Sequence, residues 1–323
     1  MLDYIAISKY LNGKDTPNLA NCQWLAAYNS GGERYAVEGC ERLEVLWNEG
    51  TRLLQLRGSV PYFFQGHNFA FDKRAFVEAV DYLQGRLCVG LWDADIDAAE
   101  VGVIFEVGRR PRDYIKNHHA RPQAHLLENE RPRDKGNFKY WEQRGGDSLK
   151  MYDAGRNIMM KQGLRRREVI EQAGWRPDGQ YMKIEAHIKH PERTNGGKAL
   201  LLEDCINPAK YGRLRALLQT MYEQLEPMRT LETPTDKRNL RTPDLLTIML
   251  AEEYMNNHDC GPEEAKKALF ERINAIGEGT LSKADKDARK RQIRALFGKL
   301  EEAAQSEYDL SNKLAAALEG EQW

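Results

Sequence analysis

Two segments, residues 100–107 and 181–189, alternate apolar with polar residues, and this alternation restricts the possible folds more than any other feature of the chain. A period of two residues is typical of a β-strand, whose side chains point alternately to opposite faces of a sheet. The polar face of the first segment carries Glu100 and Glu106. The polar face of the second carries Lys183, Glu185 and His187. We therefore expect an antiparallel sheet with one face on a core and the other facing water.

A third segment, residues 148–152, is also strand-like and is followed by the helix-compatible residues 154–162. Tyr152 therefore lies where a strand gives way to a helix. The alternation puts Lys150 on the same face as Tyr152. With the three segments as strands of one sheet, the polar face carries Lys150, Tyr152, Glu100 and Glu185.

The rest of the first half of the chain is expected to form further strands with few helices. The expected strands, with a hairpin turn at 48–50, are residues 2–7, 34–38, 41–47 and 51–58. Asp72 is expected to cap a helix with Phe76, Val80 and Leu83 on one face. This helix should pack on the sheet.

From Pro208 onward the pattern becomes helical, beginning with residues 211–225. A polar segment containing Pro234 separates this helix from a group of charged helices. We therefore expect an α+β fold in which a domain with a central antiparallel sheet is joined to an α-helical C-terminal domain. The expected bounds are 1–225 for the sheet domain, 226–241 for a linker and 242–323 for the helical domain.

The composition, with 41% hydrophobic and 30% charged residues, is typical of a soluble globular protein. No stretch approaches the roughly 18 consecutive apolar residues of a membrane-spanning helix, and the opening residues lack the pattern of a secretion signal. We expect a cytoplasmic protein of a bacterial host, with no membrane partner. The five cysteines are scattered and form no C-x-x-C pair, which indicates reduced thiols rather than zinc ligands.

The net charge of −1 conceals an uneven distribution. Residues 101–200 hold 21 Lys and Arg against 13 Asp and Glu, while residues 1–100 hold 9 against 14. Basic side chains that contact phosphates release condensed counterions, so a basic region in an otherwise acidic chain favours nucleic-acid binding. The other interpretation is an ordinary solvated surface.

Short motifs in the first 220 residues resemble, in the same order, those of the gene II and gene X replication initiators of filamentous phages, including the phage X family. The shared motifs are M-L-D-x-I at the start, Q-G-H-N at 65–68, E-V-G-V at 100–103, L-K-M-Y-D at 149–153 and M-K-I-E-A-H-I-K at 182–189. Two features depart from the pattern. Ala154 stands where many members have Lys, and the two-histidine metal motif of the broader superfamily is absent.

The resemblance implies a tyrosine endonuclease that starts rolling-circle replication. Such an enzyme cuts one strand of origin DNA, stays attached to the 5′ phosphate and later rejoins the ends. It would act with a host helicase and polymerase. By the resemblance Tyr152 is the nucleophile, and Glu100 and Glu185 match acidic strand residues of the family.

The chemistry of the residues agrees with this role. A phenol has a pKa near 10, so attack on a phosphodiester requires removal of the proton and neutralisation of the phosphate. Mg²⁺ or Mn²⁺ can supply the second function and prefers oxygen ligands. Glu100 and Glu185 are the candidate metal ligands, and His187 is a third ligand or a proton carrier.

Several other residues are candidate DNA contacts because they are basic or lie in the shared motifs. These are His67, Lys150, Lys161, Arg165, Arg166, Arg167 and Lys183. Alternatives remain for some: His67 can brace a turn instead, and the arginine run can be a solvated helix face. The alternative function is a sequence-specific DNA-binding or regulatory protein that keeps the fold without the nuclease activity, as Ala154 in place of Lys suggests.

Overall fold

The computed structural model describes residues 1–28, 31–37, 40–69, 71–130, 136–227, 241–258, 260–277, 280–303 and 308–320. The chain divides into two compact units. The first comprises Met1–Glu226 together with Leu310–Trp323, and the second comprises Pro227–Asp309.

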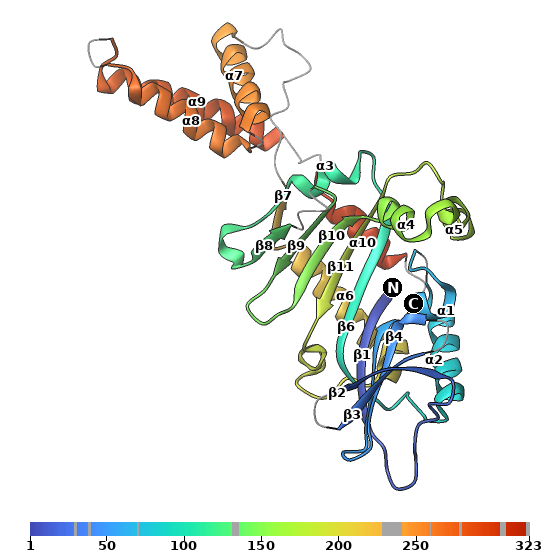
Figure 1. The fold of residues 1–323 in the computed structure, drawn as a ribbon. Coiled ribbons are helices and arrows are strands. Elements are labelled where there is room, and N and C mark those ends of the chain that lie inside the picture. The colour runs from blue at the N-terminus through green and yellow to red at the C-terminus, as the bar shows by residue number, and fades with distance from the viewer. Residues whose placement is uncertain are drawn as a thin grey trace. The chain divides into compact units, whose positions relative to one another are not determined.

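The first unit contains a ten-stranded sheet in the order β2-β3-β4-β5-β1-β6-β11-β10-β9-β8, and every neighbouring pair is antiparallel (Figure 1). A separate two-stranded sheet pairs β12 with β7. The fold is therefore α+β, as expected. The strands are β1 (Leu2–Tyr10), β2 (Cys22–Tyr28), β3 (Gly32–Val37), β4 (Cys40–Asn48), β5 (Leu53–Ser59), β6 (Asp95–Glu106), β7 (His118–Ala120), β8 (Leu127–Glu130), β9 (Phe138–Glu142), β10 (Ser148–Asp153), β11 (Tyr181–Ile188) and β12 (Leu225–Pro227).

Helices flank the sheet. Ser59 and Asp72 cap the first two helices through their side-chain oxygens, which accept from backbone N–H groups of the first turn. The α-helices of this unit are α1 (Val60–Gln65), α2 (Lys73–Leu87), α3 (Pro111–Lys116), α4 (Ala154–Gln162), α5 (Arg166–Gln172), α6 (Pro208–Tyr222) and α10 (Ser311–Glu319). The 3₁₀-helices are η1 (Pro122–Ala124), η3 (Gly163–Arg165), η4 (Pro191–Asn195) and η5 (Leu202–Ile206).

Two sets of helices pack against the central strands β6, β11 and β10 and their neighbours. Helix α6 packs against all three strands, and α10 packs against β6. Helix α4 packs against β10 and β11, while α1 packs against β1 and β4. Figure 1 shows α6 and α10 behind the strands and α4 on the near side. The sheet is thus covered on both faces around its centre.

The second unit consists of helices α7 (Thr242–His258), α8 (Pro262–Ala275) and α9 (Lys283–Ala303). Its small core consists of Ile248, Ala251, Ala265 and Phe297, all fully buried. Among the described residues of both units, no helix has the length and apolar character needed to cross a bilayer.

The expected C-terminal boundary needs a correction. We expected 242–323 to form one helical domain, but Leu310–Trp323 belongs to the unit of the sheet. Leu314 and Leu318 of α10 are buried, and the backbone N–H of Leu310 donates to the Tyr222 hydroxyl at 2.9 Å. Most of the expected linker at 226–241 lies outside the described residues.

Candidate active site

Strand register brings the candidate residues together. Lys150 of β10 lies directly opposite Glu185 of β11, and Glu185 lies opposite Gly102 of β6. Two residues along each strand, Tyr152 lies opposite Lys183. Residues that are directly opposite in an antiparallel pair point to the same face. The alternation of the sequence therefore identified one shared polar face correctly.

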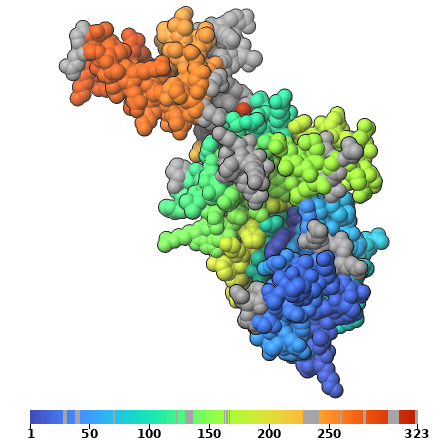
Figure 2. Space-filling model, viewed as in Figure 1, coloured from blue at the N-terminus to red at the C-terminus, as the bar shows by residue number. Residues whose placement is uncertain are grey.

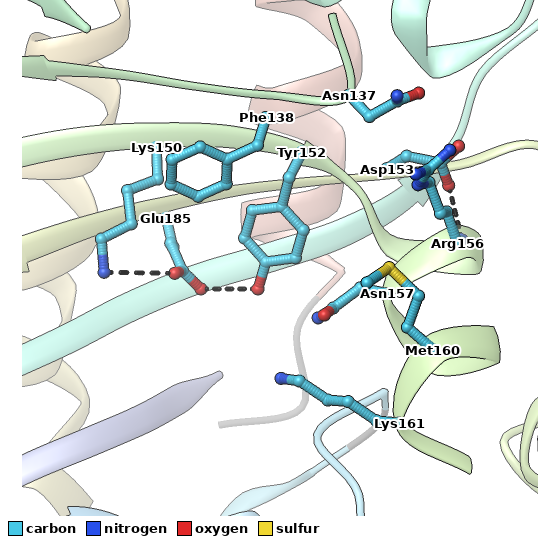
Figure 3. A pocket seen from close by; sticks show the side chains of 10 residues that line it. All are labelled: Asn137, Phe138, Lys150, Tyr152, Asp153, Arg156, Asn157, Met160, Lys161 and Glu185. Carbon is cyan, nitrogen blue, oxygen red and sulfur yellow. Dashed lines mark hydrogen bonds and ion pairs between the residues drawn. The ribbon is translucent and has the colours of Figure 1, made fainter. Parts of the chain in front are cut away.

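Tyr152 and Glu185 form a direct contact on this face. The Tyr152 hydroxyl donates a hydrogen bond to Glu185 Oε2 at 3.0 Å (Figure 3). Burial and the negative charge of Glu185 raise the pKa of Tyr152 well above its usual value, although Lys183 opposes this. The phenol is therefore protonated at neutral pH, and Glu185 is positioned to receive its proton.

Lys183 of β11 lies on the same face, directly opposite Tyr152, with its side chain 1% exposed. Its ammonium contacts Glu185 Oε2 at 2.8 Å and also pairs with Asp3 of β1. Burial alone would lower the pKa of Lys183, but the charges of Asp3 and Glu185 raise it well above the usual value. Lys183 was expected to contact DNA; because its ammonium is enclosed by carboxylates, it is instead an internal counter-charge of the site.

Glu100 of β6 is held by two further groups. It forms an ion pair with Lys150, whose ammonium also lies 3.5 Å from Glu185 Oε1. His187 Nδ1 lies 3.2 Å from Glu100 Oε1. Burial would raise the pKa of Glu100, yet His187 and Lys150 lower it to about 2. Glu100 is therefore a carboxylate throughout the physiological pH range.

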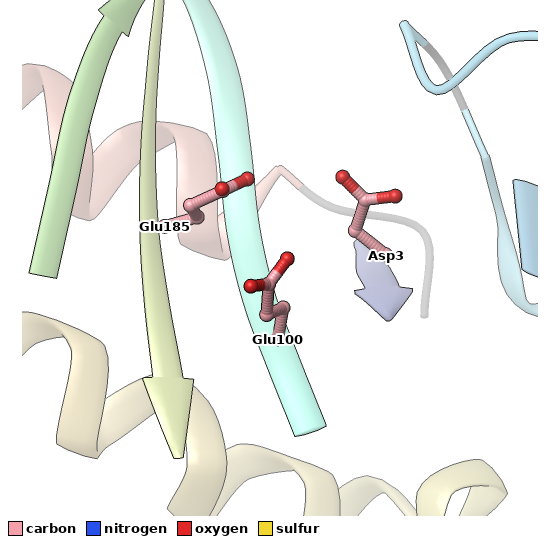
Figure 4. A group of neighbouring side chains, drawn as sticks. All are labelled: Asp3, Glu100 and Glu185. Carbon is pink, nitrogen blue, oxygen red and sulfur yellow. The ribbon is translucent and has the colours of Figure 1, made fainter. Parts of the chain in front are cut away.

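Three carboxylates converge at this point. Asp3, Glu100 and Glu185, from three adjacent strands, each offer an oxygen within 4.8 Å of the others (Figure 4). This oxygen-rich set suits a hard divalent cation. Glu100 and Glu185 were expected to meet, whereas the third member is Asp3 and not His187, which lies beside Glu100 outside the set.

Asp3 escaped the sequence reasoning although it lies in the M-L-D-x-I motif. The register between β1 and β6 shifts between Leu2 and Tyr4, and Asp3 lies at that irregularity. Such irregularities re-aim a side chain. The Asp3 carboxylate accepts from Ser59 Oγ at 2.8 Å and from Asn68 Nδ2 at 2.5 Å. The motif was the only signal for Asp3.

Gly102 also escaped notice. A Cβ at Gly102 would lie 2.6 Å from the Cβ of Glu185 and 2.9 Å from the carbonyl oxygen of Ile184. The absent side chain therefore gives Glu185 the space in which its carboxylate turns toward Tyr152. Within the E-V-G-V motif, this glycine is the residue that lets β11 approach β6 closely.

The expectation that the polar face meets water is wrong for its central residues. Tyr152 is 8% exposed and Glu185 is 5% exposed. Helices α1 and α4 cover this part of the sheet, which the alternation of the strands could not reveal. Burial is tolerated because opposite charges pair within the cluster.

A pocket of about 330 Å³ gives access to Tyr152 and Glu185. It is lined by residues of β10, β11 and α4, including Lys150 and Lys161 (Figure 3). Figure 2 shows the surface hollowed here, between the green part of the chain that carries α4 and the blue parts near the N-terminus. Tyr152 and Glu185 are therefore buried but reachable from one side.

The other expected DNA contacts are more scattered. His67 Nδ1 lies 3.2 Å from Gln65 Nε2 and accepts from the Phe69 N–H, so His67 braces the turn after α1. Arg165 and Arg167 are exposed and pair with glutamates on their own helical segment. The side chain of Arg166 lies outside the described residues.

No known family model matches the chain, and a search of curated proteins found no relative. Function is therefore inferred from the residues and geometry of the site.

Proposed function

We propose that the chain is a rolling-circle replication initiator that nicks and rejoins one strand of origin DNA through Tyr152. The observation that carries the proposal is the 3.0 Å hydrogen bond from the Tyr152 hydroxyl to Glu185, beside two further carboxylates and within a pocket open to solvent. A nucleophile paired with a base is the arrangement that covalent catalysis requires. The motif resemblance and the basic charge of residues 101–200 agree with DNA as substrate.

The proposed cleavage step uses Glu185 as the base. Glu185 Oε2 takes the phenol proton as the Tyr152 oxygen attacks phosphorus. The bond from phosphorus to the 3′ oxygen breaks, so the 5′ phosphate remains on Tyr152 and the 3′ oxygen is protonated by water. In the rejoining step a 3′ hydroxyl attacks the same phosphorus and the bond from phosphorus to the Tyr152 oxygen breaks. The 3′ hydroxyl gives up its proton as it attacks, and the Tyr152 oxygen takes a proton back from Glu185. The phosphotyrosine link conserves the bond energy, so no nucleotide is consumed.

Asp3, Glu100 and Glu185 would hold Mg²⁺ or Mn²⁺ in this proposal, because hard cations prefer carboxylate oxygens. When bound, the cation would polarise the scissile phosphate as a Lewis acid. Lys150 and Lys183 already neutralise part of the carboxylate charge. Holding a cation therefore requires at least one of these ammonium groups to give up a carboxylate contact.

The second candidate is a DNA-binding or regulatory protein with the same fold and no nuclease activity. Two observations favour it: the two lysine ammonium groups that engage the carboxylates, and the raised pKa of Tyr152. A site of this kind is a stable internal ion-pair network. The two candidates differ in whether Tyr152 ever forms a bond to DNA.

The deciding experiment is a covalent trapping assay. The protein is incubated with Mg²⁺ or Mn²⁺ and a labelled pool of random single-stranded oligonucleotides, then denatured, and the attached DNA and peptide are identified by sequencing and mass spectrometry. We expect the adduct on Tyr152. Tyr152→Phe removes only the hydroxyl and should abolish the adduct.

Tyr140→Phe on the neighbouring strand β9 is the matched control and should retain the adduct. An adduct that persists in Tyr152→Phe, or that maps to Tyr140, contradicts the assignment of the nucleophile. DNA binding without any adduct in the unaltered protein supports the second candidate.

A further inference from the structure

A second polar cluster lies next to the Tyr152 pocket and has no part in the proposed chemistry. At its centre is Tyr62 of α1, which is 8% exposed. Its buried hydroxyl forms no well-aligned hydrogen bond among the described residues, although the Arg42 guanidinium lies close enough to lower the pKa of that hydroxyl, which burial raises overall. Leaving a buried hydroxyl unpaired is unfavourable, so such groups in folded proteins call for a physical explanation.

Two cations lie against the Tyr62 ring. The guanidinium carbon of Arg42, on β4, is 4.1 Å from the ring centroid, and Lys161 Nζ, on α4, is 4.8 Å from it. Both side chains belong to exposed residues, and within the described part of the chain neither is paired with a carboxylate. Burial of the ammonium and repulsion from Arg42 lower the pKa of Lys161 to about 8. Two cations thus lie against one buried ring, and the repulsion between them contributes to the lowered pKa of Lys161.

The cluster is contiguous with the candidate active site. Lys161 lines the pocket of Tyr152, and Figure 3 shows its ammonium and the Tyr152 hydroxyl turned toward the same open space. On the other side, Ser59 links the cluster to the carboxylates. Its hydroxyl accepts from the Tyr62 N–H at 3.5 Å and donates to Asp3 at 2.8 Å.

We propose that Arg42, Tyr62 and Lys161 form a subsite for a backbone phosphate of single-stranded DNA, next to the phosphate attacked by Tyr152. This inference rests on the proposed function for the identity of the ligand. A phosphodiester carries one negative charge and two free oxygens, which accept from a guanidinium, an ammonium and a phenol together. It relieves the repulsion between the two cations and satisfies the Tyr62 hydroxyl. The DNA strand then runs from the Tyr152 pocket across α4 toward α1 and β4.

The test measures oligonucleotide affinity in a Tyr152→Phe background, which prevents cleavage. A fluorescent short oligothymidylate is titrated with the parent and with Arg42→Gln, Lys161→Gln and Tyr62→Phe. Each cation variant should bind about tenfold more weakly and lower the slope of log affinity against log salt by about 0.7. Tyr62→Phe, which lacks only the hydroxyl, should bind about fivefold more weakly with an unchanged salt slope.

Arg74→Gln is the matched control, because Arg74 is exposed on α2 and pairs with Glu78. It should bind like the parent. Cation variants that bind with the affinity and salt slope of this control overturn the subsite. Arg42 and Lys161 belong to exposed residues, so their variants should fold, and thermal unfolding checks this.

A second readout follows the Lys161 amine itself. In protein with ¹³C-methylated lysines, the Lys161 signal, assigned by its loss in Lys161→Arg, should titrate near 8. Arg42 and Lys183 lower this pKa, whereas Asp3 and Glu185 raise it. Saturating oligothymidylate should raise it toward the usual lysine value. An unchanged titration contradicts direct phosphate contact.

The outcomes also separate the subsite from the proposed function. Weakened binding in the cation variants, together with no adduct in the unaltered protein, supports the phosphate subsite and contradicts the proposed nuclease activity. An adduct in the unaltered protein, together with normal binding in the cation variants, supports the proposed nuclease activity and contradicts the phosphate subsite.

Discussion

Neighbouring residues of β11 point to opposite faces of the sheet, and the two faces are stabilised in different ways. On one face Ile184 lies opposite Met151 and Val103, and all three are buried apolar residues. On the other face Lys183 is equally buried but lies between two carboxylates. Burial stabilises the first face directly. The second face is stable only while its charges remain paired, and that same pairing holds Glu185 beside Tyr152.

The largest expected effect comes from removing the central cation of the polar face. Lys183→Met keeps the length of the side chain but leaves Asp3 and Glu185 facing each other, and it should lower the free energy of unfolding by about 3–5 kcal/mol. Chemical denaturation measures this loss. Lys183→Met combined with Glu185→Gln should be more stable than Lys183→Met alone, because one unpaired charge is removed. Equal stability of the two would contradict a role for charge pairing.

The next largest loss of stability should come from disturbing the close contact between β6 and β11 at Gly102. In Gly102→Ala the new methyl group meets Glu185 Cβ and the Ile184 carbonyl, so β6 and β11 must move apart. Overpacking of this kind should lower the free energy of unfolding by about 2–3 kcal/mol. It should also weaken adduct formation, because Glu185 moves away from Tyr152. Gly108→Ala is the control, since a Cβ there meets nothing within 4 Å. Similar losses in the two variants would exclude the steric explanation.

Acid should distinguish the two faces. The pKa of Glu100 is lowered from 4.5 to about 2 in the folded protein, so its pairing adds stability above pH 4.5 that is lost as pH falls toward 2. Glu100→Gln lacks this contribution and should be less stable by about 2 kcal/mol at neutral pH. The difference from the unaltered protein should shrink on acidification. Denaturation across this pH range measures it, and a constant difference would refute the lowered pKa.

The sequence predicted the parts of this site that depend on local periodicity. Alternation put Tyr152, Glu185 and Lys183 on one face, and strand register confirms it. It could not locate Asp3, because the direction of that side chain depends on an irregularity between two strands. Nor could it reveal the burial of Tyr152, since the covering helices are set by tertiary packing.

Long-range packing also explains the error at the C-terminus. Helix α10 has the apolar spacing of an ordinary amphipathic helix, and nothing in that spacing identifies which surface it covers. The chain places it on β6 and α6, far away in sequence. Leu314 is fully buried as a result. A domain boundary inferred from a change in secondary structure misses a helix that returns to an earlier core.

The smallest effect tests the apolar face alone. Ile184→Val removes one methylene group from a fully buried side chain and should lower the free energy of unfolding by about 1 kcal/mol. Because no charge is altered, the stability lost in Ile184→Val should stay constant across the pH range in which the stability lost in Glu100→Gln shrinks. Adduct formation should also be retained, since Glu185 keeps its position opposite Gly102. Denaturation of both variants over the same pH range measures the two losses of stability. A loss in Ile184→Val that varies with pH would mean that the two faces are coupled through the backbone of β11, and the separation of packing from chemistry would fail.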